Sequence, residues 1–421
     1  MKNREKLMHF PGLLIFILSL ILVGCSKEKP RFVCNDAIGC VEIAANEPIK
    51  IGIIQALSGK VATLGKEQIY GFELALDSWQ GKVAGHPIEP QTEDSGCTSE
   101  GGANAALKII ADPKTVAIFG TTCSGEAATA AKAMSDAGLT MISGNNSAPF
   151  LTSINGNRAP NWQPGYFRTA NNEEISGKAA ATYAYNILGV RNAATINDGD
   201  IYTRGLTDGF KKTFTALGGV VVLDTSINKG DTEMLPVLAA VANTEAQLLF
   251  FPLFQPEGNH MLRNARNNKF FNNIFLMSDG ALIENSFITE MGDLTKGMYF
   301  IGPSSVESEA VRLLDGRYQE KYNTTPSVNY YLRAYDAANL LFQAINKVAI
   351  KEPDGTLHIG RQSLREVLYA TKAFDGVTGR LTCDQFGDCA FPVFNVLRLD
   401  DPSKGVTALQ KNIQFTYSPS Q

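Results

Sequence analysis

The chain has 421 residues, of which 44% are hydrophobic and 19% charged, and a formal net charge of −4 at pH 7. This length exceeds that of one typical domain of ~100–200 residues and predicts two domains. The mildly acidic balance, without basic runs, argues against nucleic acid as a partner, because a nucleic-acid-binding chain needs a basic patch.

The N-terminal segment has the pattern of a signal peptide. Three basic residues within the first six positions precede an apolar stretch over 13–23, which is shorter than the ~20 residues of a membrane-spanning helix. The stretch leads into Leu-Val-Gly-Cys, which resembles the bacterial lipobox and would make Cys25 the lipidated first residue of the mature protein. We therefore predict a signal peptide over 1–24, an anchor and spacer over 25–47, and an extracytoplasmic location on a bacterial membrane (periplasm or outer cell surface). The alternative is an ordinary secretion signal with an incidental cysteine.

From Ile49 onward, short apolar runs alternate with amphipathic segments. The first series predicts strands at 49–54, 116–119 and 139–142, and helices around 69–79, 103–110 and 125–137. The second series predicts strands at 193–196, 220–223, 248–251 and 275–277, and helices around 206–217, 232–242 and 257–267. Such alternation indicates βαβ units, and we expect an α/β fold with two doubly wound parallel sheets.

The C-terminal part has a different pattern. Helices are predicted at 307–322, 330–350 and 361–371, with strands only after Gly379. Because these helices have no sheet of their own, we expect them to cover sheets already formed. The two lobes would then be discontinuous in sequence.

Cysteine content favours disulfides. If Cys25 is lipidated, six of the seven cysteines remain, an even number in an oxidising compartment. Six cysteines allow 15 connectivities. Two pairs are close in sequence and the remaining two cysteines form the third proposed pair: Cys34–Cys40, Cys383–Cys389 and Cys97–Cys123.

Signatures of metal binding and catalysis are missing. There is no C-x-x-C, and His86, His260 and His358 stand alone in sequence. There is also no G-x-S-x-G, H-E-x-x-H or P-loop, and the Cys123-Ser124 pair has no histidine nearby. We predict neither a cofactor nor an enzymatic activity.

Two polar residues that follow predicted strands are candidates for ligand binding, since open parallel sheets bind ligands beyond the carboxyl ends of their strands. Ser124 precedes the helix at 125–137, so its hydroxyl and the free N–H groups there could hold a carboxylate. Asp279 follows a buried strand and could pair with an ammonium group. Together they suggest a zwitterion trap. The alternatives are that Ser124 only caps its helix and that Asp279 only begins a turn before Gly280.

Several of these segments resemble the leucine/isoleucine/valine-binding protein family, which has the type I periplasmic binding fold. Similar in order and spacing are Ile49-Lys-Ile-Gly-Ile-Ile-Gln-Ala-Leu-Ser-Gly, Gly120-Thr-Thr-Cys-Ser-Gly, Met141-Ile-Ser-Gly-Asn-Asn-Ser-Ala-Pro-Phe-Leu-Thr, Asn197-Asp-Gly-Asp-Ile-Tyr-Thr-Arg-Gly-Leu, Met261-Leu-Arg-Asn-Ala-Arg and Met277-Ser-Asp-Gly. The resemblance covers 49–400. It implies two doubly wound parallel-sheet lobes joined by a multi-strand hinge, with lobe 1 over 48–169 plus 302–378 and lobe 2 over 170–301 plus 379–421.

The resemblance also implies residue roles. Ser124, helped by the backbone near Ser147 and Ala148, would bind the α-carboxylate of an amino acid. Asn146, through its carbonyl, and Asp279 would hold the α-ammonium group. The remaining implied contacts come from side chains around the ligand: Tyr202 closing over it, Phe254 as an aromatic wall and Leu64 against its side chain. Cys97 and Cys123 match the family's disulfide in the first domain.

Three features depart from the family's pattern. Asp279 replaces a glutamate, Asn145-Asn146 replaces a smaller Gly-Ala pair, and Gln255 follows Phe254 where a second aromatic residue is common. These changes weaken the expectation of a branched, apolar ligand side chain.

The function implied is that of a monomeric solute-binding lipoprotein of an ABC importer. It would close two lobes around a small amino-acid-like ligand, branched-chain or related, and deliver it to a permease, with the lipid anchor holding it at the membrane. The alternatives are an amide- or urea-type solute binder and a sensory receptor module that uses the same clamp.

Overall fold

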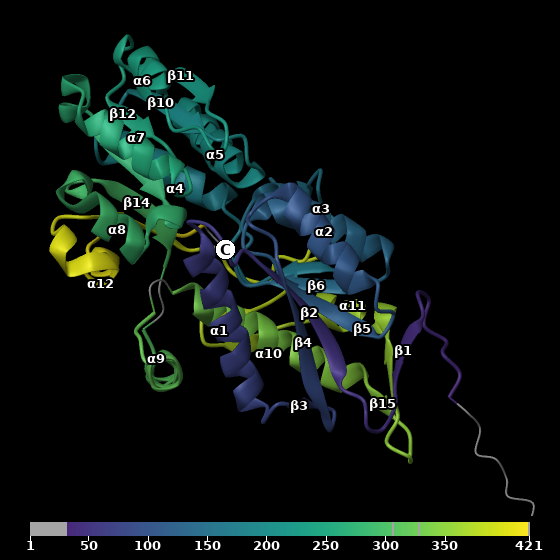
Figure 1. Ribbon diagram of the computed structural model, residues 1–421. Helices are drawn as coiled ribbons and strands as arrows, with labels where there is room; N and C mark the ends of the chain where they lie inside the picture. Colours follow the sequence, from purple (N-terminus) through teal and green to yellow (C-terminus); the bar gives the residue numbers. More distant parts are fainter. Residues whose placement is uncertain (1–31, 305–306, 327–328, 420–421) are drawn as a thin grey trace, which may run out of the picture. The chain divides into compact units, whose positions relative to one another are not determined.

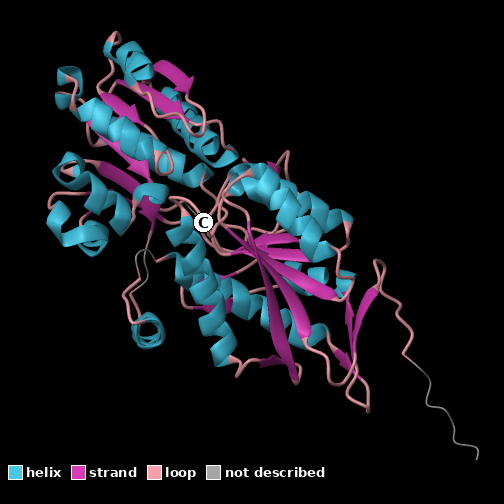
Figure 2. Cartoon of the chain, in the orientation of Figure 1, coloured by secondary structure: helices cyan, strands magenta, loops and turns pink. Residues whose placement is uncertain are grey.

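The computed structural model describes residues 32–304, 307–326 and 329–419. It contains two main β-sheets, each covered by helices on both faces (Figures 1 and 2). Both sheets belong to one compact unit, Cys34–Gln421. The predicted signal peptide and Cys25 lie outside the described residues.

The first sheet has the strand order β3-β4-β2-β5-β6-β9 and is parallel except for the two-residue strand β3. Its strands, in sheet order, are β3 (Lys82–Val83), β4 (His86–Asp94), β2 (Ile49–Gln55), β5 (Thr115–Gly120), β6 (Thr140–Ser143) and β9 (Tyr166–Arg168). The strand β4 was not predicted from its sequence, HPIEPQTED, which carries two prolines. Proline is tolerated there because β4 lies near the sheet edge, with only β3 beyond it.

Successive side chains of these strands point to opposite faces of the sheet, and each face packs against its own helices. Ile54, Ile118 and Met141 pack with helices α2 (Ser99–Ile110) and α3 (Ser124–Asp136). Their neighbours Ile53, Phe119 and Ile142 pack on the opposite face. That face is covered by α1 (Ala62–Ser78), α10 (Tyr330–Val348) and α11 (Arg361–Tyr369), as Figure 1 shows for α1 and α10. The prediction that C-terminal helices cover an existing sheet is confirmed for α10 and α11.

The second sheet has the order β11-β10-β12-β13-β14-β19-β20. Its strands are β11 (Val220–Ser226), β10 (Asn192–Asn197), β12 (Leu248–Phe250), β13 (Phe275–Asp279), β14 (Tyr299–Pro303), β19 (Phe394–Arg398) and β20 (Ile413–Tyr417). The first five are parallel, whereas β19 and β20 are antiparallel, so this sheet is mixed. The predicted α/β class with two sheets is confirmed.

Two groups of helices cover the second sheet. One face carries α4 (Glu174–Asn186) and α5 (Ile201–Ala216). The other carries α6 (Leu235–Ala242), α7 (Glu257–Arg266), α8 (Asn285–Met291) and α12 (Gly405–Lys411). Helix α9 (Glu309–Tyr322) instead packs against α1 and α10 through Tyr318.

Two predicted boundaries differ from the structure. The predicted spacer contains strand β1 (Cys40–Ile43), which pairs antiparallel with β16 (Leu357–Gly360). In addition, Cys383 and Cys389 are buried in the core of the first sheet rather than in lobe 2, and the second sheet resumes only at β19.

The described residues form three disulfides: Cys34–Cys40, Cys97–Cys123 and Cys383–Cys389. They are the pairs proposed from the sequence. The second joins the loop before α2 to the residue before α3, and so fixes the loop that presents Ser124.

Candidate functional site

A cavity lies where the carboxyl ends of strands from both sheets meet. It encloses about 440 Å³ of space, part of it open to solvent. Its lining consists of residues that follow strands of the first sheet, residues that follow or end strands of the second, and the first turn of α10: Leu64, Thr122, Ser124, Asn145, Ser147, Ala170, Asn171, Glu173, Tyr202, Phe254, Ala281, Pro303, Tyr330 and Arg333.

Ser124 forms one end of the site. It is the first residue of α3, and its Oγ accepts hydrogen bonds from the backbone N–H groups of Ser147, at 3.3 Å, and Ala148, at 3.1 Å. A hydroxyl that accepts two bonds still has its own proton to donate. Within the described part of the chain, no partner accepts that proton. The hydroxyl and the start of α3 therefore offer donors to an anion.

Ser124 is not the cap of its helix. Cys123 occupies the cap position, and the Glu126 carboxylate accepts from the backbone N–H groups of Thr122 and Cys123, both at 2.8 Å. Burial raises the pKa of Glu126 to about 7. Glu126 thus satisfies the two N–H groups that precede the helix, and Ser124 lines the cavity.

Asn146 and Ala148 do not line the cavity. The Asn146 side chain accepts from the Thr121 N–H at 3.1 Å and donates to the Thr121 carbonyl at 3.0 Å. Both backbone carbonyls accept from the guanidinium of Arg168, at 3.3 Å and 2.7 Å respectively. The proposed contact between the Asn146 carbonyl and an ammonium group is therefore not supported, because its oxygens already have partners. Asn145 lines the cavity instead.

Tyr202 lines the cavity from the second sheet's side, and Asp279 is hydrogen-bonded to Tyr202. The Tyr202 hydroxyl donates to the Asp279 carboxylate, which also accepts from the N–H of Ala281 at 3.2 Å. Asp279 is fully buried and lies behind Tyr202 rather than on the cavity surface. Burial raises its pKa to about 7, although the hydrogen bonds that the carboxylate accepts act to lower it. Asp279 also begins the turn at Gly280, as the alternative interpretation of the sequence expected.

The aromatic and apolar residues expected around the ligand line the cavity. Tyr202 and Phe254 have ring centroids 5.2 Å apart and both line the cavity. Leu64, near the start of α1, lines it from the first sheet's side. The Lys229 ammonium lies 5.2 Å from the Phe254 ring centroid on the far side of the wall and pairs with Asp200 at 2.7 Å.

Glu173 is a cavity residue that sequence reasoning missed. It is 5% exposed, and its Oε2 has no hydrogen-bond partner among the residues the structure describes. Burial, and then the charge of Asp279, raise its pKa to about 8, while Tyr202 acts in the opposite direction. The sequence held a weak signal: Glu173 follows β9, but that strand has three residues and was not predicted.

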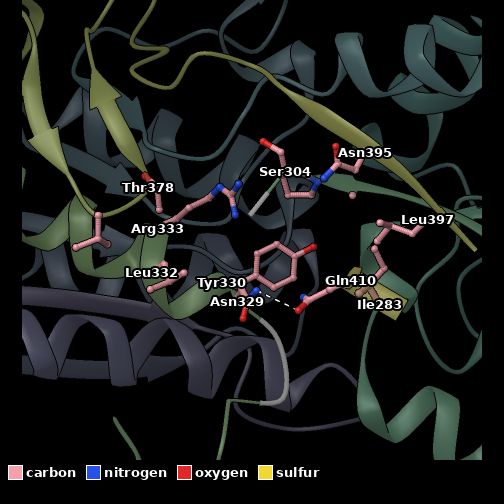
Figure 3. Close-up of a pocket in the computed structure, with 13 residues that line it drawn as sticks. Ile283, Ser304, Asn329, Tyr330, Leu332, Arg333, Thr378, Asn395, Leu397 and Gln410 are labelled. Carbon is pink, nitrogen blue, oxygen red and sulfur yellow. Dashed lines mark hydrogen bonds between the residues drawn. The ribbon is translucent and has the colours of Figure 1, made fainter. Parts of the chain in front are cut away.

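Tyr330 and Arg333 were missed for a different reason. The helix that carries them was predicted correctly but was interpreted only as a cover for a sheet. Both residues line the cavity and also a second, adjoining one (Figure 3). No sequence pattern showed that the N-terminal turn of α10 reaches the ends of the strands.

Comparison with known proteins places this geometry in a family. A model of the periplasmic binding protein family matches residues 48–396. The Leucine-, isoleucine-, valine-, threonine-, and alanine-binding protein of Pseudomonas aeruginosa is 26% identical over 351 residues, which cover 82% of this chain and 88% of that protein. The Leu/Ile/Val-binding protein BraC3 of Rhizobium johnstonii is 24% identical over 348 residues, covering 81% and 91%.

Solved structures show the same fold. A leucine-binding protein from Thermotoga maritima has a TM-score of 0.75 at 21% identity, with 88% of this chain and 99% of that chain covered. A solute-binding protein of an ABC transporter from R. palustris, solved with benzoate, has a TM-score of 0.72 at 21% identity, covering 88% and 96%.

Across the described residues, no helix combines the length and apolar character needed to cross a membrane. The family model spans most of the chain, and its members are binding proteins rather than enzymes. The chain therefore belongs to the periplasmic binding protein family.

Proposed function

We propose that this protein is the solute-binding component of an ABC importer and that its ligand is an α-amino acid held as a zwitterion. One observation carries the proposal: the same cavity is lined by Ser124, with its hydroxyl and N–H donors, and by the buried carboxyl group of Glu173, and a second buried carboxyl group, Asp279, lies behind the cavity residue Tyr202. Donors stabilise a carboxylate and carboxylates stabilise an ammonium group. The names of the curated relatives, which bind leucine, isoleucine and valine, agree with this ligand class.

Transport requires the ligand to stabilise the closed state. Ser124 follows a strand of the first sheet, whereas Tyr202 and Phe254 follow strands of the second. A ligand that contacts both sheets gains contacts available only when the sheets are close, and this difference in affinity shifts the equilibrium towards closure. The closed form would then dock on a permease. Lipidation at Cys25 would keep the protein at the membrane and raise its effective concentration near that partner.

A thermal-shift screen of the full-length chain tests the ligand class. The free amino acids, simple amides, urea and benzoate are the ligands to compare. An amino acid that binds only the folded state should add ~2.7 kcal/mol of stability at a hundred times its Kd. Ser124→Ala should remove that gain. Ser135→Ala is the matched control, since this serine lies on the same helix but donates to the Pro164 carbonyl outside the cavity.

Two results would contradict the proposal. A shift with amides, urea or benzoate but with no amino acid would retain a solute-binding site and reject the zwitterion. An amino-acid shift that survives Ser124→Ala unchanged would show that the carboxylate binds elsewhere.

A further inference from the structure

Arg333 is a buried cation without a partner. It lies in the first turn of α10, is 8% exposed, and its guanidinium forms no hydrogen bond or ion pair within the described ranges, 32–304, 307–326 and 329–419. Asp336, one turn further along the helix, does not serve it. That carboxylate accepts from the N–H groups of Val377, at 2.8 Å, and Thr378, at 2.9 Å, and from the Thr378 hydroxyl.

The Arg333 side chain lies between two cavities. In Figure 3 it extends from α10 into a space of about 630 Å³, part of it open to solvent, whose lining includes Ser304, Thr378 and Asn395. Pro303, Tyr330 and Arg333 line both this space and the ligand cavity. The Arg333 side chain therefore borders both cavities.

A guanidinium in this position needs an anion. Burying a charge without a partner is costly, and Glu173 acts on Arg333 only through its charge, without a hydrogen bond. Burial lowers the pKa of Arg333, with the charges of Tyr330, Asp336 and Glu173 acting in the opposite direction. Arginine nevertheless stays protonated in proteins, so an anion that enters the cavity meets a charged guanidinium with no partner among the described residues.

We propose that Arg333 determines specificity by binding a carboxylate on the side chain of the ligand, so that the preferred ligands are acidic α-amino acids. This inference rests on the proposed function. The α-carboxylate would lie at Ser124, the α-ammonium group at Glu173 and Asp279, and the side-chain carboxylate at Arg333. Leucine in the same site would leave the guanidinium buried and unpaired, and a site built to pair with a polar group discriminates strongly against a ligand that lacks it.

Isothermal titration calorimetry on the full-length chain tests this specificity with L-glutamate, L-aspartate and L-leucine. The wild type should bind one of the acidic ligands on the order of 10–100-fold more tightly than leucine, the range expected for a hydrogen bond to a charged group. Arg333→Met, which keeps the length of the side chain but removes the charge, should abolish this preference. Arg333→Lys should retain part of it.

The matched control is Arg365→Met. Arg365 is also buried, but its guanidinium donates to the Leu139 carbonyl, at 2.6 Å, and the Ser135 carbonyl, at 3.3 Å, and it lines neither cavity. This variant should lower stability without changing the order of ligand affinities. If Arg333→Met does not fold, the order of affinities in the wild type decides the question.

The outcomes separate this inference from the proposed function. Binding of leucine as tightly as the acidic ligands, or an unchanged order in Arg333→Met, would overturn the role of Arg333 and leave the zwitterion site intact. Binding of none of the amino acids would overturn both. Acetate that binds to the leucine-saturated wild type, but not to Arg333→Met, would show that Arg333 holds a separate anion and would also refute the inference.

Discussion

Replacing Asp279 with asparagine should stabilise the ligand-free protein at neutral pH. The carboxylate is fully buried and accepts hydrogen bonds from the Tyr202 hydroxyl and the Ala281 N–H through the same oxygen, Oδ2. An asparagine can keep that oxygen and place its amide nitrogen at the Oδ1 position, 3.4 Å from the Ser278 Oγ. The Asp279→Asn substitution therefore removes a buried charge without removing the two acceptor contacts.

The expected magnitude follows from the pKa. Burial raises the pKa of Asp279 from its ordinary value of 3.8 to about 7, so the folded state binds the proton more tightly than the unfolded state. The Asp279 carboxyl group therefore does not lower the free energy of unfolding of the wild type below about pH 4, and it lowers this free energy increasingly as the pH rises to about 7. At 1.36 kcal/mol per unit of pKa, the loss amounts to at most about 4 kcal/mol above pH 7. Asp279→Asn does not titrate and should avoid this loss.

Urea denaturation at pH 5, 6, 7 and 8 measures this difference. The stability advantage of Asp279→Asn over the wild type should grow by up to about 1.4 kcal/mol per pH unit up to pH 7 and then level off. The same variant should bind amino acids more weakly, because the ammonium group loses a charged partner. An equal pH dependence in the two proteins would refute the reasoning.

Asp94→Asn is a control for which the expected change in stability at neutral pH has the opposite sign. Burial raises the pKa of Asp94, but the hydrogen bonds that its carboxylate accepts from the N–H groups of Leu57 and Gly96, both at 2.9 Å, lower it more, so that the pKa is lowered overall. A lowered pKa stabilises the folded state above the unfolded-state value near 3.8. Asp94→Asn should therefore be less stable than the wild type at pH 7, and this deficit should shrink as the pH falls below about 4.

Three further substitutions test the packing around the site by urea denaturation. Arg168→Met breaks a buried ion pair with Asp388 and should cost ~3–5 kcal/mol; a cost under ~1 kcal/mol would mean that Asp388 finds another partner. Replacing both Cys97 and Cys123 with serine opens a loop with a sequence separation of 26 and should cost roughly 3 kcal/mol, whereas no loss would argue against a structural role for this disulfide. Gly177→Ala places a Cβ 2.5 Å from a backbone oxygen of α5 and should cost ~1–3 kcal/mol by separating α4 from α5; a neutral result would show that these helices can move apart.

Much of the fold follows from local sequence patterns. The apolar runs and helical periods predicted three of the six strands of the first sheet, four of the seven strands of the second and several of the helices between them, because each pattern reflects which face of an element is buried. The approximate places of Ser124, Tyr202, Phe254 and Asp279 followed from one rule: parallel strands present the residues after them at a common edge.

Elements with weak or short patterns were not predicted. Strand β4 carries prolines that only an edge position tolerates, and β9 is too short to show a period. Missing β9 had a functional consequence, because Glu173 follows it and faces the cavity. Strands β19 and β20 pair antiparallel with a sheet formed much earlier in the chain, a choice that depends on long-range contacts.

Only the tertiary structure decided which polar groups face the ligand cavity. The family resemblance implied that both Asn146 and Asp279 hold the ammonium group, but the Asn146 side chain is bonded to Thr121, and neither residue lines the cavity. In the sequence, Arg333 is one residue of a predicted helix. The packing of α10 places it at the cavity, without a partner among the described residues. A sequence pattern determines which side of an element is buried, whereas the hydrogen-bond partners of a buried polar group depend on residues far away in the chain.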